Sequence, residues 1–190
     1  MRRLVRKLLP SVGLLLLNGF LLSAQELSLS TNALGYANMG TMNITAAWGF
    51  SRHFSAETGV RYNPFTFPGR EGVADVMHNR QRTLSAGLRF WPWHIHSGWW
   101  LGGKAQYQEY NIGGITEPEA HEGDRYGFGL IGGYTYMLSP HFNLELGAGA
   151  WAGHESYTVF ECPECGRIVD NGKRTFFLPD ELLLGLVYVF

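Results

Sequence analysis

The stretch Leu182–Phe190, LLLGLVYVF, decides the fold class because large apolar residues recur at every second position. Successive side chains of a β-strand point to opposite faces of the sheet. The residues that share one face are Leu182, Leu184, Leu186, Tyr188 and Phe190. A strand that forms the wall of a membrane barrel presents such a face to lipid. We therefore predict a β-strand in contact with a membrane.

The first 24 residues have the three parts of a secretory signal peptide. Arg2, Arg3, Arg6 and Lys7 precede an apolar stretch over residues 8–22, and Ser23 and Ala24 are small. This stretch of about fifteen residues is shorter than the roughly 20 that a membrane-spanning helix needs. We predict cleavage after Ala24 and one domain over residues 25–190.

The composition of the exported part excludes some functions. The chain has 15 Lys+Arg and 16 Asp+Glu, and the leader holds four of the basic residues and none of the acidic ones, which leaves 11 against 16. This acidic balance does not favour a nucleic-acid partner. Charged residues make up only 16% of the chain, whereas aromatic residues make up 14%. After the leader, no segment is apolar enough for a membrane helix, so membrane residence requires a closed barrel of strands.

Strand-like runs recur along the chain with alternating short and long connections. The expected strands are residues 27–34, 42–50, 54–62, 82–90, 98–110, 125–138, 141–151 and 176–190. The long connections cover residues 63–81, 112–124 and 152–175. This pattern predicts an all-β, eight-stranded antiparallel up-and-down transmembrane β-barrel with short periplasmic turns and longer extracellular loops.

The two faces of these runs differ in chemistry. One face is apolar throughout, and the other is mostly glycine with a few charges of both signs. An eight-stranded membrane barrel is just wide enough for side chains to fill it, so small residues and compensating ions belong inside. We predict an interior ion network formed by Glu57, Arg61, Arg89, Lys104, Arg125, Glu145 and Glu181. A soluble lipocalin-like barrel would instead carry many Lys and Glu on its polar face.

Aromatic residues gather near both ends of the expected strands, as in the two aromatic girdles of outer-membrane barrels. One expected girdle contains Phe50, Phe54, Phe90, Trp99, Tyr136, Phe142, Tyr188 and Phe190. The other contains Tyr62, Tyr107, Tyr126, Trp151, Phe176 and Phe177.

The only cysteines, Cys162 and Cys165, lie in the longest expected loop of an exported chain. Two nearby thiols in an oxidising compartment favour a disulfide. The alternatives are a metal site, for which His154 or His121 would have to supply further ligands, and free or redox-active thiols.

His94 and His96 form a weaker metal candidate, and we expect them at an interface belt beside their neighbouring tryptophans. The acidic segment 118–124 lacks an ordered calcium-ligand spacing, and we expect a solvated loop there. We expect no metal or cofactor.

The segment RHFSAE, residues 52–57, raises one enzymatic hypothesis. His53 and Ser55 resemble the His-x-Ser stretch of outer-membrane lipid A deacylases, which use a histidine, a serine and an acid for hydrolysis. The expected topology places both residues at a periplasmic turn, away from lipid A in the outer leaflet. We therefore expect no catalytic residues and keep a lipid-modifying enzyme as the alternative function.

Two resemblances refine this interpretation. The ending Leu186, Tyr188 and Phe190 resembles the C-terminal signature that the barrel assembly machinery reads in outer-membrane proteins. The segments TNALGYA (31–37), YNPFTF (62–67), YQEYNIGGI (107–115) and CPECG (162–166) resemble a family of Bacteroidota outer-membrane proteins catalogued only as a domain of unknown function. That resemblance implies a link to fimbrial gene neighbourhoods. Residues 176–180, FFLPD, depart from the aromatic-x-Gly-Pro-Thr run of the family.

The sequence thus predicts a small non-enzymatic protein of the bacterial outer membrane with a filled interior. Its surface loops would serve structural, adhesive or fimbria-associated contacts. The expected partners are outer-membrane lipid and lipopolysaccharide, the barrel assembly machinery, and fimbrial or other surface proteins.

Overall fold

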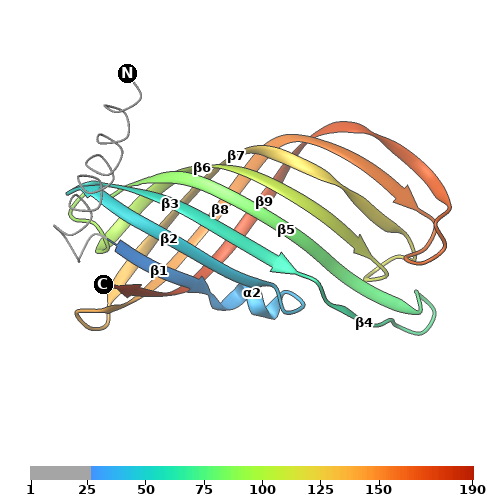
Figure 1. Cartoon of the computed structure of the whole chain (residues 1–190), viewed down its shortest axis with the longest axis horizontal. Coiled ribbons are helices and arrows are strands. Elements are labelled where there is room, and N and C mark those ends of the chain that lie inside the picture. Colours follow the sequence, from blue (N-terminus) through green and yellow to red (C-terminus); the bar gives the residue numbers. More distant parts are fainter. Residues whose placement is uncertain (1–26) are drawn as a thin grey trace, which may run out of the picture.

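The computed structural model describes residues 27–190, so the predicted signal peptide over residues 1–24 lies outside the described part (Figure 1). The structure is almost entirely β. Its elements are β1 (Leu27–Asn32), α2 (Ala33–Ala37), β2 (Met42–Ser51), β3 (Phe54–Asn63), β4 (Thr66–Pro68), β5 (Val76–Phe90), β6 (Gly98–Gly113), β7 (Ala120–Met137), β8 (Phe142–Phe160) and β9 (Ile168–Val189). Within residues 27–190, no helix is long and apolar enough to cross a membrane.

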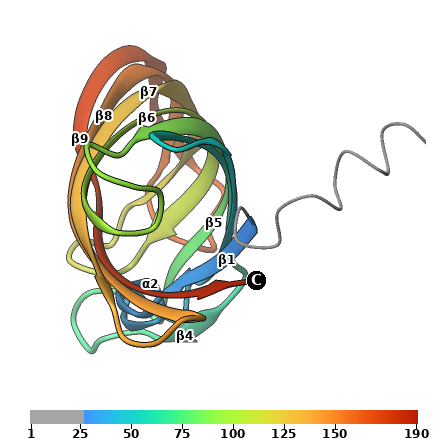
Figure 2. The same ribbon diagram turned by 90° about the vertical axis from the view of Figure 1, so that its left-hand side faces the viewer.

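The strands form one antiparallel sheet whose hydrogen bonds run in a ring. The order is β3-β2-β1-β9-β8-β7-β6-β5-β4, and an additional pairing of β3 with β5 closes the ring (Figure 2). The short β4 lies beside β5 beyond the end of β3. The backbone N–H of Phe190 donates to the carbonyl of Leu27 at 3.1 Å, so the first and last described residues meet at one end, here called the terminal end.

The prediction of long loops is mostly wrong, because the strands continue through these segments. β7 and β8 pair from the terminal end as far as Ala120 and Phe160, and β9 begins at Ile168 rather than at Phe176. The hairpins β6–β7 and β8–β9 therefore extend far beyond β1 and β2 at the opposite end, here called the hairpin end (Figure 1). The first expected strand is too long, because Leu34 lies in the one-turn helix α2.

The apolar face of the strands points outward and the glycine-rich face points inward. Leu88, Leu101 and Leu130 are 56%, 60% and 70% exposed, respectively. Arg89, Lys104 and Glu145 on the opposite face are buried inside the ring. Phe128 on β7 and Leu182 on β9 belong to the same exposed apolar band.

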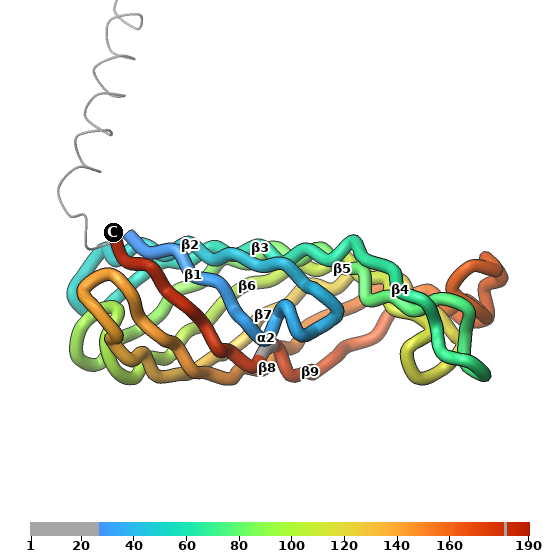
Figure 3. The backbone as a smooth tube through the Cα atoms, turned by 90° about the horizontal axis from the view of Figure 1, so that it is seen from below, coloured from blue at the N-terminus to red at the C-terminus, as the bar shows by residue number. Residues whose placement is uncertain are grey.

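The contact between β1 and β9, here called the seam, is short and consists of five residue pairs. Beyond the pair Asn32 and Gly185, no described strand covers the second edge of β9. The Asn32 side chain continues the ladder, since its Nδ2 donates to the Leu182 carbonyl at 2.9 Å and its Oδ1 accepts from the Leu184 N–H at 3.0 Å. Figure 3 shows β9 running beside β1 and then continuing past α2 toward the hairpin end.

A β-bulge lies on β9 next to this seam. Ala148 of β8 pairs with Leu182, whereas Ala150 pairs with Pro179, so β9 holds one extra residue between these pairs. A bulge changes which residues of a strand face inward. Pro179 suits this place because it has no N–H to give to a ladder.

The connection between β5 and β6 folds across the terminal end (Figure 2). The backbone N–H groups of Trp91 and Ile95 donate to the carbonyls of His53 and Arg52 in the neighbouring turn. The side chains of Trp91 and His96 are 1% and 7% exposed, so the expectation that the histidine pair lies in an interface belt is wrong for His96. The connection folds inward, so that Trp91 packs against His96 and Trp100 inside the ring, and this explains the difference.

Candidate functional site

The ring interior near the terminal end contains a buried ion cluster around Arg89. The Arg89 Nε lies 2.5 Å from a Glu57 carboxylate oxygen, and its Nη1 lies 3.0 Å from Glu145. The Thr135 hydroxyl also donates to Glu145 at 3.0 Å, and the guanidinium stacks 4.0 Å from the Trp100 ring centroid. A buried arginine between two carboxylates and an aromatic ring is held in one geometry.

A second cluster surrounds Asp180 halfway along the interior. Its side chain is 1% exposed, and its carboxylate lies 2.8 Å from Arg61 Nη2 and 2.6 Å from Lys104 Nζ. The Gln106 side chain joins this cluster, because its Oε1 accepts from Arg61 at 2.9 Å and its Nε2 donates to Asp180 at 3.2 Å. The cluster links β3, β6 and β9 across the ring.

A third cluster lies closer to the hairpin end. The Glu155 carboxylate is fully buried and is bound by both Arg125 and Arg174. The Arg125 guanidinium also lies 3.7 Å from the Tyr110 ring centroid. Charge is therefore distributed along the interior, and carboxylates and cations alternate in each cluster.

The structure places six residues of the predicted ion network inside the ring: Glu57, Arg61, Arg89, Lys104, Arg125 and Glu145. The side chain of Glu181 is outside the described part, and the neighbouring Asp180 occupies the predicted place of a carboxylate on β9. The alternation read back from Leu182 predicts an inward side chain at position 181, and the structure shows a bulge here and an inward Asp180. Pro179 is the one signal in the sequence for this irregularity.

The prediction also misses Glu155 and Arg174. Both belong to a segment that the sequence assigns to a loop, whereas β8 and β9 continue through it. The sequence does indicate that β8 continues beyond Trp151. Gly147, Gly149, Gly153 and Glu155 are all an even number of residues from Glu145, as expected for one inward-facing row of a single strand. Trp151 and Phe176 were expected in a girdle. This is wrong for Trp151, because it is 4% exposed and packs edge-to-face against Phe176 with ring centroids 4.5 Å apart.

An apolar plug fills the interior at the terminal end. Its buried members are Trp91, Ile95, Trp100 and Ile131, with Leu183 against them. The Trp91 Nε1 donates to the Ser55 hydroxyl at 3.0 Å. Gly133 makes room for this plug, because a Cβ there would lie 2.7 Å from the Trp100 ring and 2.4 Å from the Leu146 carbonyl.

The interior beyond the plug contains a cavity of about 490 Å³. Its floor includes Arg61, Gln106 and Asp180 of the second ion cluster, and Trp151 forms part of its wall. Most of its other polar lining residues are carboxamides. The cavity extends to the seam, where Leu34 and Gly35 of α2 lie on one side and residues 178–182 of β9 on the other.

The residues considered for hydrolysis do not form a catalytic pair in the described chain. His53 Nδ1 lies 2.8 Å from the carbonyl of Trp91, and the Ser55 hydroxyl is fully buried and accepts from the Trp91 ring. Each residue thus holds the β5–β6 connection in place. Among residues 27–190, no group of three or more His, Cys, Asp or Glu side chains is arranged to hold a metal ion.

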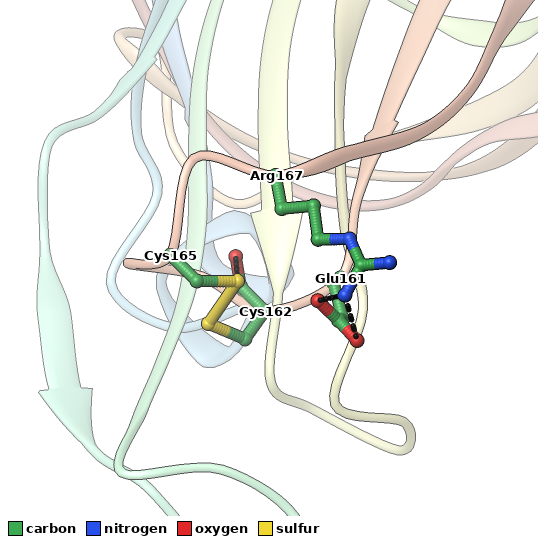
Figure 4. Close-up of a disulfide and its surroundings, with 4 residues drawn as sticks. All are labelled: Glu161, Cys162, Cys165 and Arg167. Carbon is green, nitrogen blue, oxygen red and sulfur yellow. Dashed lines mark hydrogen bonds and ion pairs between the residues drawn. A yellow bond between two sulfur atoms is a disulfide. The ribbon is translucent and has the colours of Figure 1, made fainter.

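Cys162 and Cys165 are joined by a disulfide at the tip of the β8–β9 hairpin (Figure 4). The tip is further held by an ion pair between Arg167 Nη1 and Glu161 at 3.2 Å. Both residues of this pair are exposed, and the disulfide closes only a short loop. The tip is therefore a small turn that is cross-linked by the disulfide and lies outside the interior clusters.

Leu186, Tyr188 and Phe190, the residues of the expected assembly signal, lie on the outer face of β9, and they are 47%, 39% and 42% exposed. The rings of Tyr188 and Phe190 form an aromatic patch with the ring of Phe142 on β8. The ring of Tyr188 is 5.1 Å from both Phe142 and Phe190. Such a patch is accessible to a partner or to lipid.

Comparison with known proteins identifies the family of the chain. No curated protein and no solved structure matches the chain. The model of the family described as "Protein of unknown function (DUF3575)" matches residues 11–190. Because this match covers nearly the whole chain, the protein belongs to that family.

Proposed function

We propose that the ring is an eight-stranded transmembrane β-barrel of the bacterial outer membrane, without enzymatic activity, that presents its long hairpins outside the cell. The observation that carries this proposal is the exposed apolar band around the ring, which leaves the charges inside. On β7, Leu130 and Phe128 lie in the band between the exposed rings of Tyr126 and Tyr136. Residues 126–136 match the 9–11 residues of a tilted membrane strand.

The filled terminal end supports an anchoring role rather than a pore. Trp91 and Trp100 close the interior together with the Arg89 cluster. Eight strands leave little space beyond their own side chains. Planar-bilayer recordings of the purified protein are expected to show no persistent conductance, and stable channels would contradict a closed terminal end.

Charge substitutions on β7 test the membrane location directly. Leu130→Arg places a cation in the middle of the proposed band and is expected to destabilise the protein in phospholipid vesicles by about 2–4 kcal/mol. Glu122→Arg serves as the matched control, because Glu122 has the same outward parity but lies beyond Tyr126. Equal tolerance of both substitutions, or folding without lipid or detergent, would refute the barrel in a membrane.

The hairpins are the parts of the molecule that can contact other surface structures. The β8–β9 hairpin with its Cys162–Cys165 tip and the β6–β7 hairpin extend beyond the aromatic rings of Tyr107 and Tyr126. A structural, adhesive or fimbria-associated role is therefore proposed for these hairpins. Crosslinking from a photoreactive residue at position 164 on intact cells is expected to capture a surface protein, while the same probe at position 52 in a terminal turn should not.

The alternative of a lipid-modifying enzyme has less support in the geometry. His53 and Ser55 contact Trp91 at the terminal end, where the proposed orientation places the periplasm. The mass spectrum of lipid A is expected to be the same with and without the gene.

A further inference from the structure

The cavity of about 490 Å³ has a lining that an anchoring role does not require. Seven described carboxamide side chains line it: Asn32, Asn38, Asn43, Asn79, Gln81, Gln106 and Gln108. Asn32 and Asn43 bind backbone groups and Gln106 belongs to the Asp180 cluster, so Asn38, Asn79, Gln81 and Gln108 are the ones that can meet a ligand. A carboxamide offers both donors and an acceptor, which is the combination that hydroxyl groups of a saccharide require. The wall formed by the buried ring of Trp151 adds an apolar surface suited to the carbon face of a sugar.

Several of these carboxamides bind one another in the described structure. Gln108 Nε2 donates to Gln81 Oε1 at 2.7 Å, and Asn79 Nδ2 donates to Asn38 Oδ1 at 3.0 Å. Neutral pairs of this kind can exchange a mutual hydrogen bond for bonds to ligand hydroxyls at low cost. The charged groups of the lining are already engaged, since Asp180 binds both Arg61 and Lys104, and Arg125 binds Glu155. The lining therefore favours an uncharged polyhydroxylated group over an ion.

The cavity reaches the seam between α2 and β9, where the Asn32 side chain bonds the backbone of Leu182 and Leu184. Leu34 of α2 and Leu182 of β9 both line the cavity, yet they are 41% and 68% exposed on the outer surface. Between them, β9 beyond Gly185 has no second strand among the described residues. Leu182 pairs with Ala148 and is followed by the outward Leu184 and Leu186, which places this part of the seam within the apolar band. A polar group inside the cavity can thus be joined to an apolar chain lying along the outside.

We propose that this cavity binds the saccharide headgroup of a membrane amphiphile, which enters between α2 and β9 while its acyl chains stay on the outer surface. This inference rests on the membrane location proposed above. The shared chemistry is a neutral sugar, and its source is lipid-borne because the proposed entrance lies in the apolar band. The carboxamides orient the sugar and Trp151 packs against it.

Native mass spectrometry of the protein in lipid nanodiscs tests the inference. The nanodiscs contain phosphatidylcholine with a minor fraction of monogalactosyldiacylglycerol as the probe. Wild-type protein is expected to retain one galactolipid in strong preference to phosphatidylcholine. The double variant Gln81→Leu/Gln108→Leu removes the carboxamide pair and is expected to lower this preference about tenfold, the factor that corresponds to about 1.4 kcal/mol of lost hydrogen bonding.

Two further variants make the test specific. Leu182→Trp narrows the proposed entrance from the outside and leaves the Gln81–Gln108 pair in place, and it should reduce retention of the galactolipid as well. Asn171→Leu removes an exposed carboxamide on the β8–β9 hairpin, away from the cavity, and should leave retention unchanged. Incorporation into nanodiscs and the heat-dependent gel mobility of each variant report folding independently of lipid retention.

Each outcome bears on a different claim. Equal retention of both lipids by folded wild-type protein overturns the saccharide site. Displacement of the galactolipid by free galactose at low concentration overturns lateral entry and assigns the cavity to a soluble sugar. Failure of wild-type protein to enter nanodiscs overturns the proposed membrane location instead, so the two proposals fail in distinguishable ways.

Discussion

The two halves of the ring interior are built on the same strands but filled differently. At the terminal end, Trp91 and Trp100 with the Arg89 cluster leave little space. Toward the hairpin end, carboxamides and the Asp180 cluster surround a cavity of about 490 Å³. Both halves have glycine-rich strands, so the strand pattern alone does not explain the difference.

The difference comes from the segments that cover each half. The β5–β6 connection folds into the terminal end and adds Trp91, Ile95 and His96 to the interior. At the hairpin end, β1 stops at Asn32 and the single turn of α2 takes its place, which leaves the edge of β9 open. Substitutions in the packed half are expected to lower the free energy of unfolding more than substitutions in the open half.

Removal of the central cation of the packed half should cause the largest loss of stability. Arg89→Met leaves the buried carboxylates of Glu57 and Glu145 without their shared cation, which is expected to cost about 3–5 kcal/mol. Denaturant unfolding in phospholipid vesicles, followed by far-UV circular dichroism, measures this loss. Arg89→Lys keeps the charge but loses the fork geometry, so it should fall between wild type and Arg89→Met. A loss below about 1 kcal/mol for Arg89→Met would show that the cluster is not structural.

Two neighbouring glycines provide the next comparison. Gly133→Ala forces a Cβ against Trp100 and a backbone carbonyl and should cost about 1–3 kcal/mol. Gly132→Ala faces outward, where a Cβ has its first neighbour at 3.5 Å, and should change stability by less than about 0.5 kcal/mol. The same unfolding experiment compares them, and equal effects would contradict the assignment of the inner face.

A smaller effect is expected from protonation of His96 at the terminal end. Burial lowers the pKa of His96 below its ordinary value of 6.5; Glu145 partly opposes this shift, while Arg89 and His94 add to it. In the unfolded chain His96 therefore takes up a proton near pH 6.5, whereas in the folded chain its side chain stays neutral. The free energy of unfolding thus falls as the pH decreases through 6.5. The positive φ of 61° at His96 is one that asparagine tolerates. His96→Asn should reduce the loss of stability between pH 7.5 and 5.5, and an unchanged pH profile would exclude this contribution.

The smallest change is expected in the open half. Gln108→Leu removes one partner of the Gln81 pair at 2.7 Å, but both side chains are only partly buried and water can replace the bond. The free energy of unfolding should change by less than about 0.5 kcal/mol. A loss comparable to that of Arg89→Met would show that the carboxamides hold the fold together and would remove the contrast between the halves.

Much of the fold could be read from local patterns. Period-two alternation identifies the strands and separates the apolar face from the face that carries Glu57, Arg89 and Glu145. The extent of the strands was missed, because Gly, Asp and Asn in residues 152–175 indicate loops locally, whereas pairing with β8 and β7 keeps them extended. Tertiary pairing often overrides local propensity in strands.

The sequence by itself determined the β class, the two faces and most of the charges that the interior contains, because these depend on the alternation of neighbouring residues. Only the tertiary structure decided that Asp180 faces inward at a bulge, that Trp91 and His96 fold into the terminal end, and that β9 has an open edge beside α2. These features depend on the register and relative length of strands that are distant in the sequence. A shift of one residue in register moves a side chain to the opposite face, and no local pattern encodes that shift.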